Sequence, residues 1–230
     1  MTERAAAALA RAAIAQVRPG DLVGLGSGRA ASAFIHALGD AVRAGLPVTG
    51  VATSEASAGL ARSLGIALVD EWAAIDLAVD GADEVDPGLD LVKGYGGALV
   101  REKIVAAAAR RFIILVGEEK LVPVLGARGR LPIEVVPFGL PLCRRRLSEM
   151  GLAPSVRQAG QAPLVSDNGN LILDLAVSAI SDPAGLDAAL RAIPGVVGTG
   201  LFLAMADQVL VWDGERIRSL ERNHREEGPS

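Results

Sequence analysis

Short runs of apolar residues alternate with alanine-rich stretches through the first half of the chain. Continuous apolar runs are typical of strands buried on both faces, and the stretches between them have the composition of helices. Strands are expected at 21–26, 48–53, 66–69, 76–80 and 112–116, and helices at 3–17, 30–38, 55–64 and 98–110. This alternation predicts an α/β fold with a doubly wound, mostly parallel sheet covered on both faces.

The pattern changes near residue 126. Gly126-Ala-Arg-Gly-Arg130 and Leu131-Pro132 have the composition of a connector, and the sequence beyond them predicts a smaller α+β lobe. Asn168-Gly169 is a strong turn signal, so the flanking runs 164–166 and 171–175 are expected to form a hairpin. Further strands are expected at 133–136 and 209–212, the second returning to the first sheet, and helices at 140–151 and 184–193.

These patterns divide the chain into two parts. Residues 1–126 together with 205–220 are expected to form the larger domain, which carries the chemistry, and residues 127–204 the small lobe. The sequence from Glu215 onward is charged and is expected to fray, with residues 221–230 set apart as a tail.

Composition argues against a nucleic-acid partner. Of the 230 residues, 50% are hydrophobic and only 3% are aromatic, and the formal net charge is −4. A nucleic-acid-binding protein usually has a basic stripe, or aromatic residues on which bases stack. The one concentrated basic run, Arg144-Arg145-Arg146, is interpreted as a solvated helix face.

Membrane insertion and histidine or cysteine chemistry are also disfavoured. No apolar run approaches the about 20 residues that a membrane-spanning helix needs. The single cysteine, Cys143, cannot form an internal disulfide or a metal cluster, which fits a reducing cytoplasmic compartment. The two histidines, His36 and His224, fall in a predicted helix and in the tail, so we expect neither to be catalytic. A Ser-His-Asp triad or a histidine zinc site therefore has nothing to build from.

A glycine-rich turn, Gly24-Leu-Gly26-Ser27-Gly28, joins the first predicted strand to a helix. Glycines let a ligand approach the backbone, and the helix that follows presents free N–H groups to an anion. The glycine spacing is not that of a dinucleotide fingerprint, and no acidic residue ends the second strand at 51–54. The turn therefore favours a monophosphate site, with a tight turn that binds nothing as the alternative.

An acidic segment, Asp80-Gly81-Ala82-Asp83-Glu84-Val85-Asp86, begins where another strand ends. Ligands bind at this edge of an open parallel sheet. Four carboxylates within seven residues repel one another, which is energetically costly unless water solvates them or they take part in a functional site. The alternatives are a turn capped by Asp83 and a divalent-cation site, since carboxylates spaced in this way hold Mg²⁺.

A second glycine-rich loop, Lys93-Gly94-Tyr95-Gly96-Gly97, leads into the helix that carries Glu102. A carboxylate can remove a proton from a carbon beside a carbonyl, and an ammonium can stabilise the oxyanion that forms. The alternative for Glu102 is a surface position favoured by the helix dipole and paired with Arg101 or Lys103. Because the loops after parallel strands share one rim, we expect all three segments to meet there and form a phosphosugar site.

The chain resembles the ribose-5-phosphate isomerase A family over residues 5–213. The resemblance lies in the order and spacing of several motifs: Gly24-Leu-Gly-Ser-Gly28, Thr53-Ser54, Asp80-Gly-Ala-Asp-Glu84, Lys93-Gly-Tyr-Gly-Gly97, Arg101-Glu102-Lys103, Leu131-Pro-Ile-Glu-Val135, Asp167-Asn-Gly-Asn170 and Ile193-Pro-Gly-Val-Val197. It implies interconversion of D-ribose 5-phosphate and D-ribulose 5-phosphate in the non-oxidative branch of the pentose phosphate pathway. It also implies a Rossmann-like domain with a small lobe, an enediolate route without metal or cofactor, and a homodimer or homotetramer.

Matched residue by residue, the resemblance implies roles for particular side chains. Glu102 matches the general base that moves a proton between C2 and C1. Asp80, Asp83 and Lys93 match residues that assist ring opening and stabilise the enediolate. The substrate-binding positions it implies are Ser27, Gly28, Arg29, Ala30, Gly81, Ala82, Gly94, Tyr95, Gly96 and Lys120.

The chain departs from the family pattern at three places. Ser27-Gly28-Arg29-Ala30 stands where the family usually has Thr-Gly-Ser-Thr, so two hydroxyl donors are lost and Arg29 is expected to offer its guanidinium to a phosphate. Tyr95 replaces a usual glycine and is expected to narrow the pocket or form a lid, with strain if its φ is positive. Glu119 replaces a usual serine and adds negative charge beside Lys120.

Two alternatives to this isomerase stay open from the sequence. Arg29, Ala30 and Tyr95 favour an isomerase of another phosphosugar, which a panel of substrates would distinguish. A regulatory domain that binds a sugar phosphate without turnover is the other. Such a domain needs no base, so the presence of Glu102 together with Lys93 argues against it. The fold alone cannot distinguish these three functions.

Overall fold

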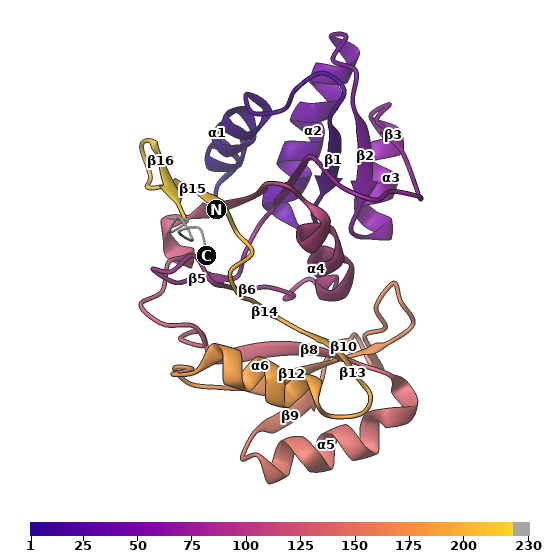
Figure 1. Ribbon diagram of the computed structural model, residues 1–230, viewed down its shortest axis with the longest axis vertical. Coiled ribbons are helices and arrows are strands. Elements are labelled where there is room, and N and C mark those ends of the chain that lie inside the picture. The colour runs from indigo at the N-terminus through magenta and orange to yellow at the C-terminus, as the bar shows by residue number, and fades with distance from the viewer. Residues whose placement is uncertain (223–230) are drawn as a thin grey trace, which may run out of the picture.

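A seven-stranded sheet forms the centre of the protein in the computed structural model, which describes residues 1–222. Its strand order is β16-β15-β7-β4-β1-β2-β3, and every neighbouring pair except β15–β16 is parallel. The strands are β1 (Leu22–Leu25), β2 (Thr49–Ala52), β3 (Ala67–Leu68), β4 (Leu77–Asp80), β7 (Phe112–Gly117), β15 (Gln208–Trp212) and β16 (Ile217–Glu221). The predicted α/β, mostly parallel arrangement is confirmed, as is the return of 209–212 to this sheet (Figure 1).

The direction in which the sheet grows reverses between β1 and β4. From β1 the chain adds β2 and then β3 on one side, whereas β4, β7 and β15 are added on the other side. The loops that follow β1 and β4 therefore diverge and leave a crevice at the carboxyl ends of these two strands. Open α/β sheets bind their ligands at such a switch point.

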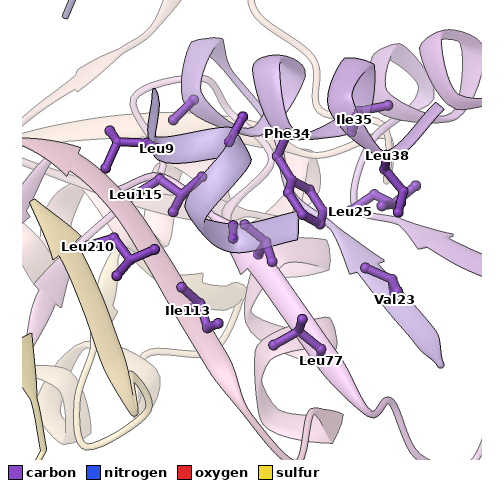
Figure 2. Close-up of a cluster of buried hydrophobic side chains, with 14 of the residues drawn as sticks. Leu9, Val23, Leu25, Phe34, Ile35, Leu38, Leu77, Ile113, Leu115 and Leu210 are labelled. Atoms are coloured by element: carbon purple, nitrogen blue, oxygen red, sulfur yellow. The ribbon is translucent and has the colours of Figure 1, made fainter. Parts of the chain in front are cut away.

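Helices α1 (Glu3–Ile14) and α2 (Arg29–Arg43) cover one face of the sheet. Alternate strand residues point to that face and pack against Leu9 of α1 and Phe34 of α2, as Figure 2 shows for Leu25, Ile113 and others. Helix α2 is longer than the predicted 30–38, because Gly39 continues the helix where it packs against Leu64; a Cβ at Gly39 would lie 2.7 Å from the Leu64 Cβ.

The other face of the large sheet packs against α4 (Leu99–Ala108) and a three-stranded antiparallel sheet ordered β14-β6-β5. The short strands of this sheet are β5 (Glu84–Val85), β6 (Leu91–Val92) and β14 (Leu201–Phe202), and α3 (Glu55–Ser63) follows β2. Helix α4 approaches β1 closely at Gly24, where a Cβ would lie 2.5 Å from Val105 Cγ1. The absence of a side chain at Gly24 thus lets α4, the helix that carries Glu102, pack close to β1.

A separate four-stranded antiparallel sheet, ordered β13-β8-β12-β9 and called the small sheet below, lies at the other end of the molecule with α5 and α6 (Figure 1). Its elements are β8 (Arg130–Val135), α5 (Leu140–Glu149), β9 (Ala153–Val156), β12 (Leu171–Ala176), α6 (Pro183–Arg191) and β13 (Val196–Thr199). Between β9 and β12 the chain forms a short ribbon of β10 (Gln158–Ala159) and β11 (Ala162–Pro163), and single 3₁₀ turns occur at Glu118–Lys120 and Pro137–Gly139. Arg144-Arg145-Arg146 is exposed on α5, as predicted.

Two predictions in this half of the chain differ from the structure: one holds only in part, and the other is wrong. The runs 164–166 and 171–175 pair only next to the turn, where Val165 forms an antiparallel bridge with Leu171 and the Ser166 N–H donates to the Asn170 carbonyl at 2.8 Å. The rest of β12 pairs with β8 and β9 instead. The Asn-Gly turn is present, with Gly169 at φ +77°. The charged sequence from Glu215 does not fray at once, since β16 pairs along β15 to Glu221 and buries part of Ile217 and Leu220. Residues 223–230, with His224, lie outside the described residues.

Over residues 1–222, none of the helices combines the length and the hydrophobicity that crossing a lipid bilayer requires.

We expect Gly24→Ala to lower the free energy of unfolding by about 1–3 kcal/mol, because the added methyl would overpack the contact between β1 and α4. The matched control is Gly59→Ala, since Gly59 is exposed in α3 and a Cβ there meets nothing within 4 Å. Alanine should stabilise that helix by up to about 1 kcal/mol. Urea unfolding of both variants measures the difference, and equal effects at the two glycines would contradict the packing argument.

Candidate active site

A cavity of about 400 Å³ opens at the switch point of the large sheet. The loops after β1, β4 and β6 and the segment after β7 form its walls. Three predicted catalytic residues line it, namely Asp83, Lys93 and Glu102. The predicted substrate-binding residues that line it are Ser27, Gly28, Arg29, Ala30, Gly81, Ala82, Gly94, Gly96 and Lys120. The predicted residues that line the cavity thus come from positions up to 93 residues apart in the chain, Ser27 and Lys120.

The ammonium of Lys93 lies at the centre of this site. Its Nζ donates to Asp80 Oδ2 at 2.8 Å and to the Gly81 carbonyl at 2.6 Å, and Glu102 Oε2 lies 3.3 Å away. The side chains of Lys93, Asp80 and Glu102 are only 3%, 3% and 5% exposed. One cation is therefore shared by two carboxylates in a region that water hardly reaches.

Asp80 lies beneath the cavity and does not line it. It ends β4, and its Oδ1 accepts hydrogen bonds from the backbone N–H groups of Ser27 at 3.1 Å and Gly81 at 2.7 Å. Space for the carboxylate exists only because residue 26 is glycine; a Cβ at Gly26 would lie 2.2 Å from Asp80 Cγ. The turn after β1 and the end of β4 thus hold Asp80 so that its other oxygen meets Lys93.

Glu102 comes from the first turn of α4 and faces the cavity, so the surface alternative for this residue is wrong. Its backbone N–H donates to the Ala98 carbonyl, which fixes it at the helix start. Within the described structure, its buried Oε2 accepts no hydrogen bond. A carboxylate oxygen with free lone pairs beside an ammonium is suited to accept a proton from a bound ligand.

Asp83 connects the site to the loop that carries Lys93. Its Oδ2 accepts from the Tyr95 N–H at 2.9 Å, and its Oδ1 lies 3.9 Å from Lys120 Nζ. The carboxylate is therefore not the isolated turn cap of the alternative interpretation, because it also faces the cavity and a lysine. The residue that follows, Glu84, is fully buried and holds the backbone N–H groups of Gly126 and Arg128 at 2.6 and 2.7 Å.

A second part of the cavity wall is mainly cationic, with Glu119 as an acidic residue beside Lys120. Arg29, Lys120 and Arg128 all line it, and Gly28 caps the start of α2 without a side-chain hydrogen bond, so first-turn N–H groups stay available. Arg29 also donates to the Met1 carbonyl at 3.0 Å. The hydroxyl of Ser27 is turned toward α3, where it bonds to Ser54 at 2.8 Å. An anion at this wall would therefore meet backbone and guanidinium donors.

Tyr95 does not enter the cavity, so the expectation that it narrows the pocket or forms a lid is wrong. Its phenol donates to the Arg130 carbonyl at 3.1 Å, and the Arg130 guanidinium lies 3.8 Å from the ring centroid. Residue 95 does not have the positive φ that would strain a side chain. The ring packs against Arg130 of β8, while Asp83 holds the backbone N–H of Tyr95.

Several lining residues were not predicted from the sequence: Met1, Leu115, Val116, Gly117 and Arg128. Arg128 falls in the segment interpreted as a connector, and a basic residue between two glycines was the signal available there. His36 is exposed on α2, away from the cavity. Within residues 1–222, the His, Cys, Asp and Glu side chains form no group of three that could hold a metal ion, so the cation-site alternative for the acidic segment finds no support.

Comparison with known proteins agrees with this geometry. The model of the ribose 5-phosphate isomerase A (phosphoriboisomerase A) family matches residues 49–215. The ribose-5-phosphate isomerase A of Thermomicrobium roseum is 52% identical over 226 residues, which cover 96% of this chain and 95% of that protein. The chain belongs to the ribose-5-phosphate isomerase A family.

Solved structures of family members show the same fold. The ribose 5-phosphate isomerase A from Methanocaldococcus jannaschii superposes with a TM-score of 0.91 at 39% identity, covering 96% of this chain and all (100%) of that one. A D-ribose-5-phosphate isomerase in complex with phospho-erythronic acid superposes with a TM-score of 0.92 at 38% identity, with the same coverage of 96% and 100%. The resemblance stated from the motifs is confirmed.

Burial and neighbouring charges shift the pKa values of the site residues in opposite directions. Burial raises the pKa of Glu102 to about 8, although the Lys93 charge lowers it in part. Burial likewise raises the pKa of Asp80 against the influence of Lys93 and its hydrogen bonds. Burial alone would lower the pKa of Lys93, but the charges of Asp80, Glu102 and Asp83 raise it above its ordinary value. Lys93 therefore stays protonated, and Glu102 is the group that can exchange a proton near neutral pH.

We expect Lys93→Met to destabilise the protein by about 3 kcal/mol at pH 7.5, because two buried carboxylates would lose their cation. Both carboxyl pKa values would then rise further above those of the unfolded chain. The loss of unfolding free energy relative to wild type should therefore grow as the pH rises, and it should shrink as both carboxyl groups become protonated toward pH 5. Urea unfolding at the two pH values measures it.

The control for this experiment is Lys120→Met, since Lys120 is 28% exposed and lies 3.9 Å from its carboxylate. It should change the stability by less than about 1 kcal/mol at both pH values. A deficit in Lys93→Met that is the same at pH 5 and 7.5 would mean that packing, rather than charge compensation, is lost.

Proposed function

We propose that this protein interconverts D-ribose 5-phosphate and D-ribulose 5-phosphate through an enediolate, with Glu102 as the general base. One observation carries the proposal, namely the buried Lys93 ammonium held between Asp80 and Glu102 at a cavity with a cationic wall. Such a site pairs a base with a fixed positive charge. The named activity of the relatives supports the same reaction.

In the proposed reaction, the Glu102 carboxylate removes the proton from C2 of the open-chain aldose. The C2–H electron pair forms the C1=C2 bond, and the carbonyl oxygen becomes an oxyanion that the Lys93 ammonium stabilises. Transfer of a proton from the C2 hydroxyl to that oxygen, and return of the Glu102 proton to C1, complete the ketose. The steps conserve atoms and electrons and use side chains alone.

The two aspartates then have different tasks. Asp83 lines the cavity and faces it with a carboxylate, which suits it to accept a hydroxyl proton when the sugar ring opens. Asp80 does not line the cavity and acts by holding Lys93 charged and in place. Arg29, Lys120 and Arg128, with the start of α2, would bind the phosphate.

Three wider expectations stay proposals. We infer a homodimer or homotetramer and a cytoplasmic location from the family resemblance. We also keep the division into a catalytic domain of residues 1–126 plus 205–220 and a small lobe of 127–204. The grouping of β8, β9, β12 and β13 in a sheet of their own supports this division.

Another phosphosugar is the second candidate substrate. Arg29 and Glu119, two of the departures from the family pattern, both line the cavity. A panel of phosphopentoses and phosphohexoses would reveal a preference that these side chains create. The regulatory alternative is disfavoured, because a buried lysine–carboxylate cluster is costly for a domain that only binds.

We expect wild-type protein to form ketose from ribose 5-phosphate in the presence of EDTA, and Glu102→Gln to lose at least 100-fold in kcat, since general bases contribute about 10²–10⁴-fold. The variant should still bind phospho-erythronic acid. Glu149→Gln, at a 52% exposed position on α5, is the control and should retain full activity. A loss below tenfold in Glu102→Gln would remove Glu102 from the role of base.

The pH dependence of kcat/KM should report the raised pKa of Glu102. Because the base must be ionised, kcat/KM should rise with pH and level off above about pH 8. A Lys93→Met variant with residual activity should show this rise at a higher pH, since the ammonium that lowers the carboxyl pKa is gone. Rates measured from pH 6 to 9.5 test this, and a flat wild-type profile over that range would contradict it.

A further inference from the structure

The loop that carries Lys93 is held from outside the cavity by one arginine whose side chain is mostly shielded from water. Arg157 follows β9 in the small sheet, and its Nη1 donates to the Gly94 carbonyl at 2.8 Å and the Tyr95 carbonyl at 2.9 Å. Its Nε donates to Asp174 Oδ2 at 2.9 Å, and its Nη2 donates to Asp174 Oδ1. The side chains of Arg157 and Asp174 are 10% and 13% exposed.

This contact constrains a segment that would otherwise be poorly defined. Gly94 and Gly97 have φ values of +102° and +89°, and glycine-rich backbone loses much conformational freedom when it is ordered. On the N–H side the loop is held by Asp83, which accepts from Tyr95. On the carbonyl side it is held by Arg157. The loop thus lies between two fixed groups, one beside the cavity and one in the small sheet.

The geometry of the guanidinium explains why arginine is used. Asp174 is a mid-strand residue of β12 and holds two of the guanidinium nitrogens, which leaves the third to point at the loop. A planar fork of donors can satisfy a carboxylate and two carbonyls together, whereas an ammonium on a flexible stem cannot. Asp174 pairs with Arg157 and also lies 3.7 Å from Arg130 Nε, so it offsets part of the positive charge of both arginines.

We propose that Arg157, oriented by Asp174, is a positioning residue for the isomerase reaction, setting Lys93 and Glu102 through the carbonyls of Gly94 and Tyr95. Arg157 does not line the cavity and touches no reacting atom. The loop it holds begins with Lys93 and ends at the start of α4, which bears Glu102. The catalytic part of this inference rests on the proposed function; the effect on the loop does not.

The test compares Arg157→Ala, Arg157→Lys and Asp174→Asn with wild type. We expect kcat to fall at least 30-fold in Arg157→Ala and about tenfold in Arg157→Lys, while KM changes less than threefold because the cationic wall is untouched. Arg145→Ala, at an exposed position on α5, is the matched control and should keep wild-type kcat. Added guanidinium ion should restore part of the kcat of Arg157→Ala and none of that of Glu102→Gln.

A second measurement does not depend on turnover. Hydrogen–deuterium exchange of the peptide covering residues 93–102 should quicken in Arg157→Ala and Arg157→Lys and stay unchanged in Arg145→Ala. If wild type itself formed no ketose, the proposed function would fail, and this exchange would still decide whether Arg157 holds the loop.

Three results would overturn the inference. One is a folded Arg157→Ala with kcat within threefold of wild type, and another is unchanged exchange in residues 93–102. The third is a lower melting temperature with normal kcat in the folded fraction, which would make Arg157 a structural residue only. Should Arg157→Ala fail to fold, Arg157→Lys decides by the same criteria.

Discussion

The burial of one lysine among carboxylates is the constraint on which the rest of the site depends. An ammonium is costly to remove from water, and so is a carboxylate, so each is tolerable here only because the other is fixed within hydrogen-bond distance. Asp80 holds Lys93, two backbone N–H groups hold Asp80, and Gly26 leaves the space for that carboxylate. Burial raises the pKa of Glu102, and the Lys93 charge, which it shares with Asp80, lowers that pKa only in part.

Much of this arrangement could be predicted from the sequence because it depends on local patterns. Apolar runs identified the parallel strands, and glycines or charged residues directly after them identified the loops that meet at the switch point. Pairing partners and side-chain directions could not be predicted in the same way. Asn168-Gly169 specifies a turn, but most of β12 pairs with β8 and β9 rather than with the run before the turn. Arg128 reaches the cavity only because Glu84, distant in sequence, holds its backbone.

Tyr95 shows the same limit at a single residue. A side chain in place of a glycine suggests an obstacle in the pocket when the loop is considered alone. In the folded protein, Arg130 of β8 lies on the outer side of the loop. The Tyr95 hydroxyl donates to its carbonyl, and its guanidinium lies over the Tyr95 ring. The direction of the side chain is therefore set by a segment that follows it by 35 residues and belongs to another sheet.

The small sheet consequently acts on the site through α4 as well as through the loop before it. Arg101 donates to Asn168 Oδ1 and the Asp167 carbonyl at 2.9 Å each, and buried Glu134 accepts from Asn168 at 3.0 Å. On the other flank, Lys103 donates to the carbonyls of Thr199 and Leu201 at 2.7 and 2.8 Å. Glu102 lies between these two anchored neighbours. A carboxylate whose helix is held on both sides can face a cavity with an unpaired oxygen, because its position does not depend on hydrogen bonds to that oxygen.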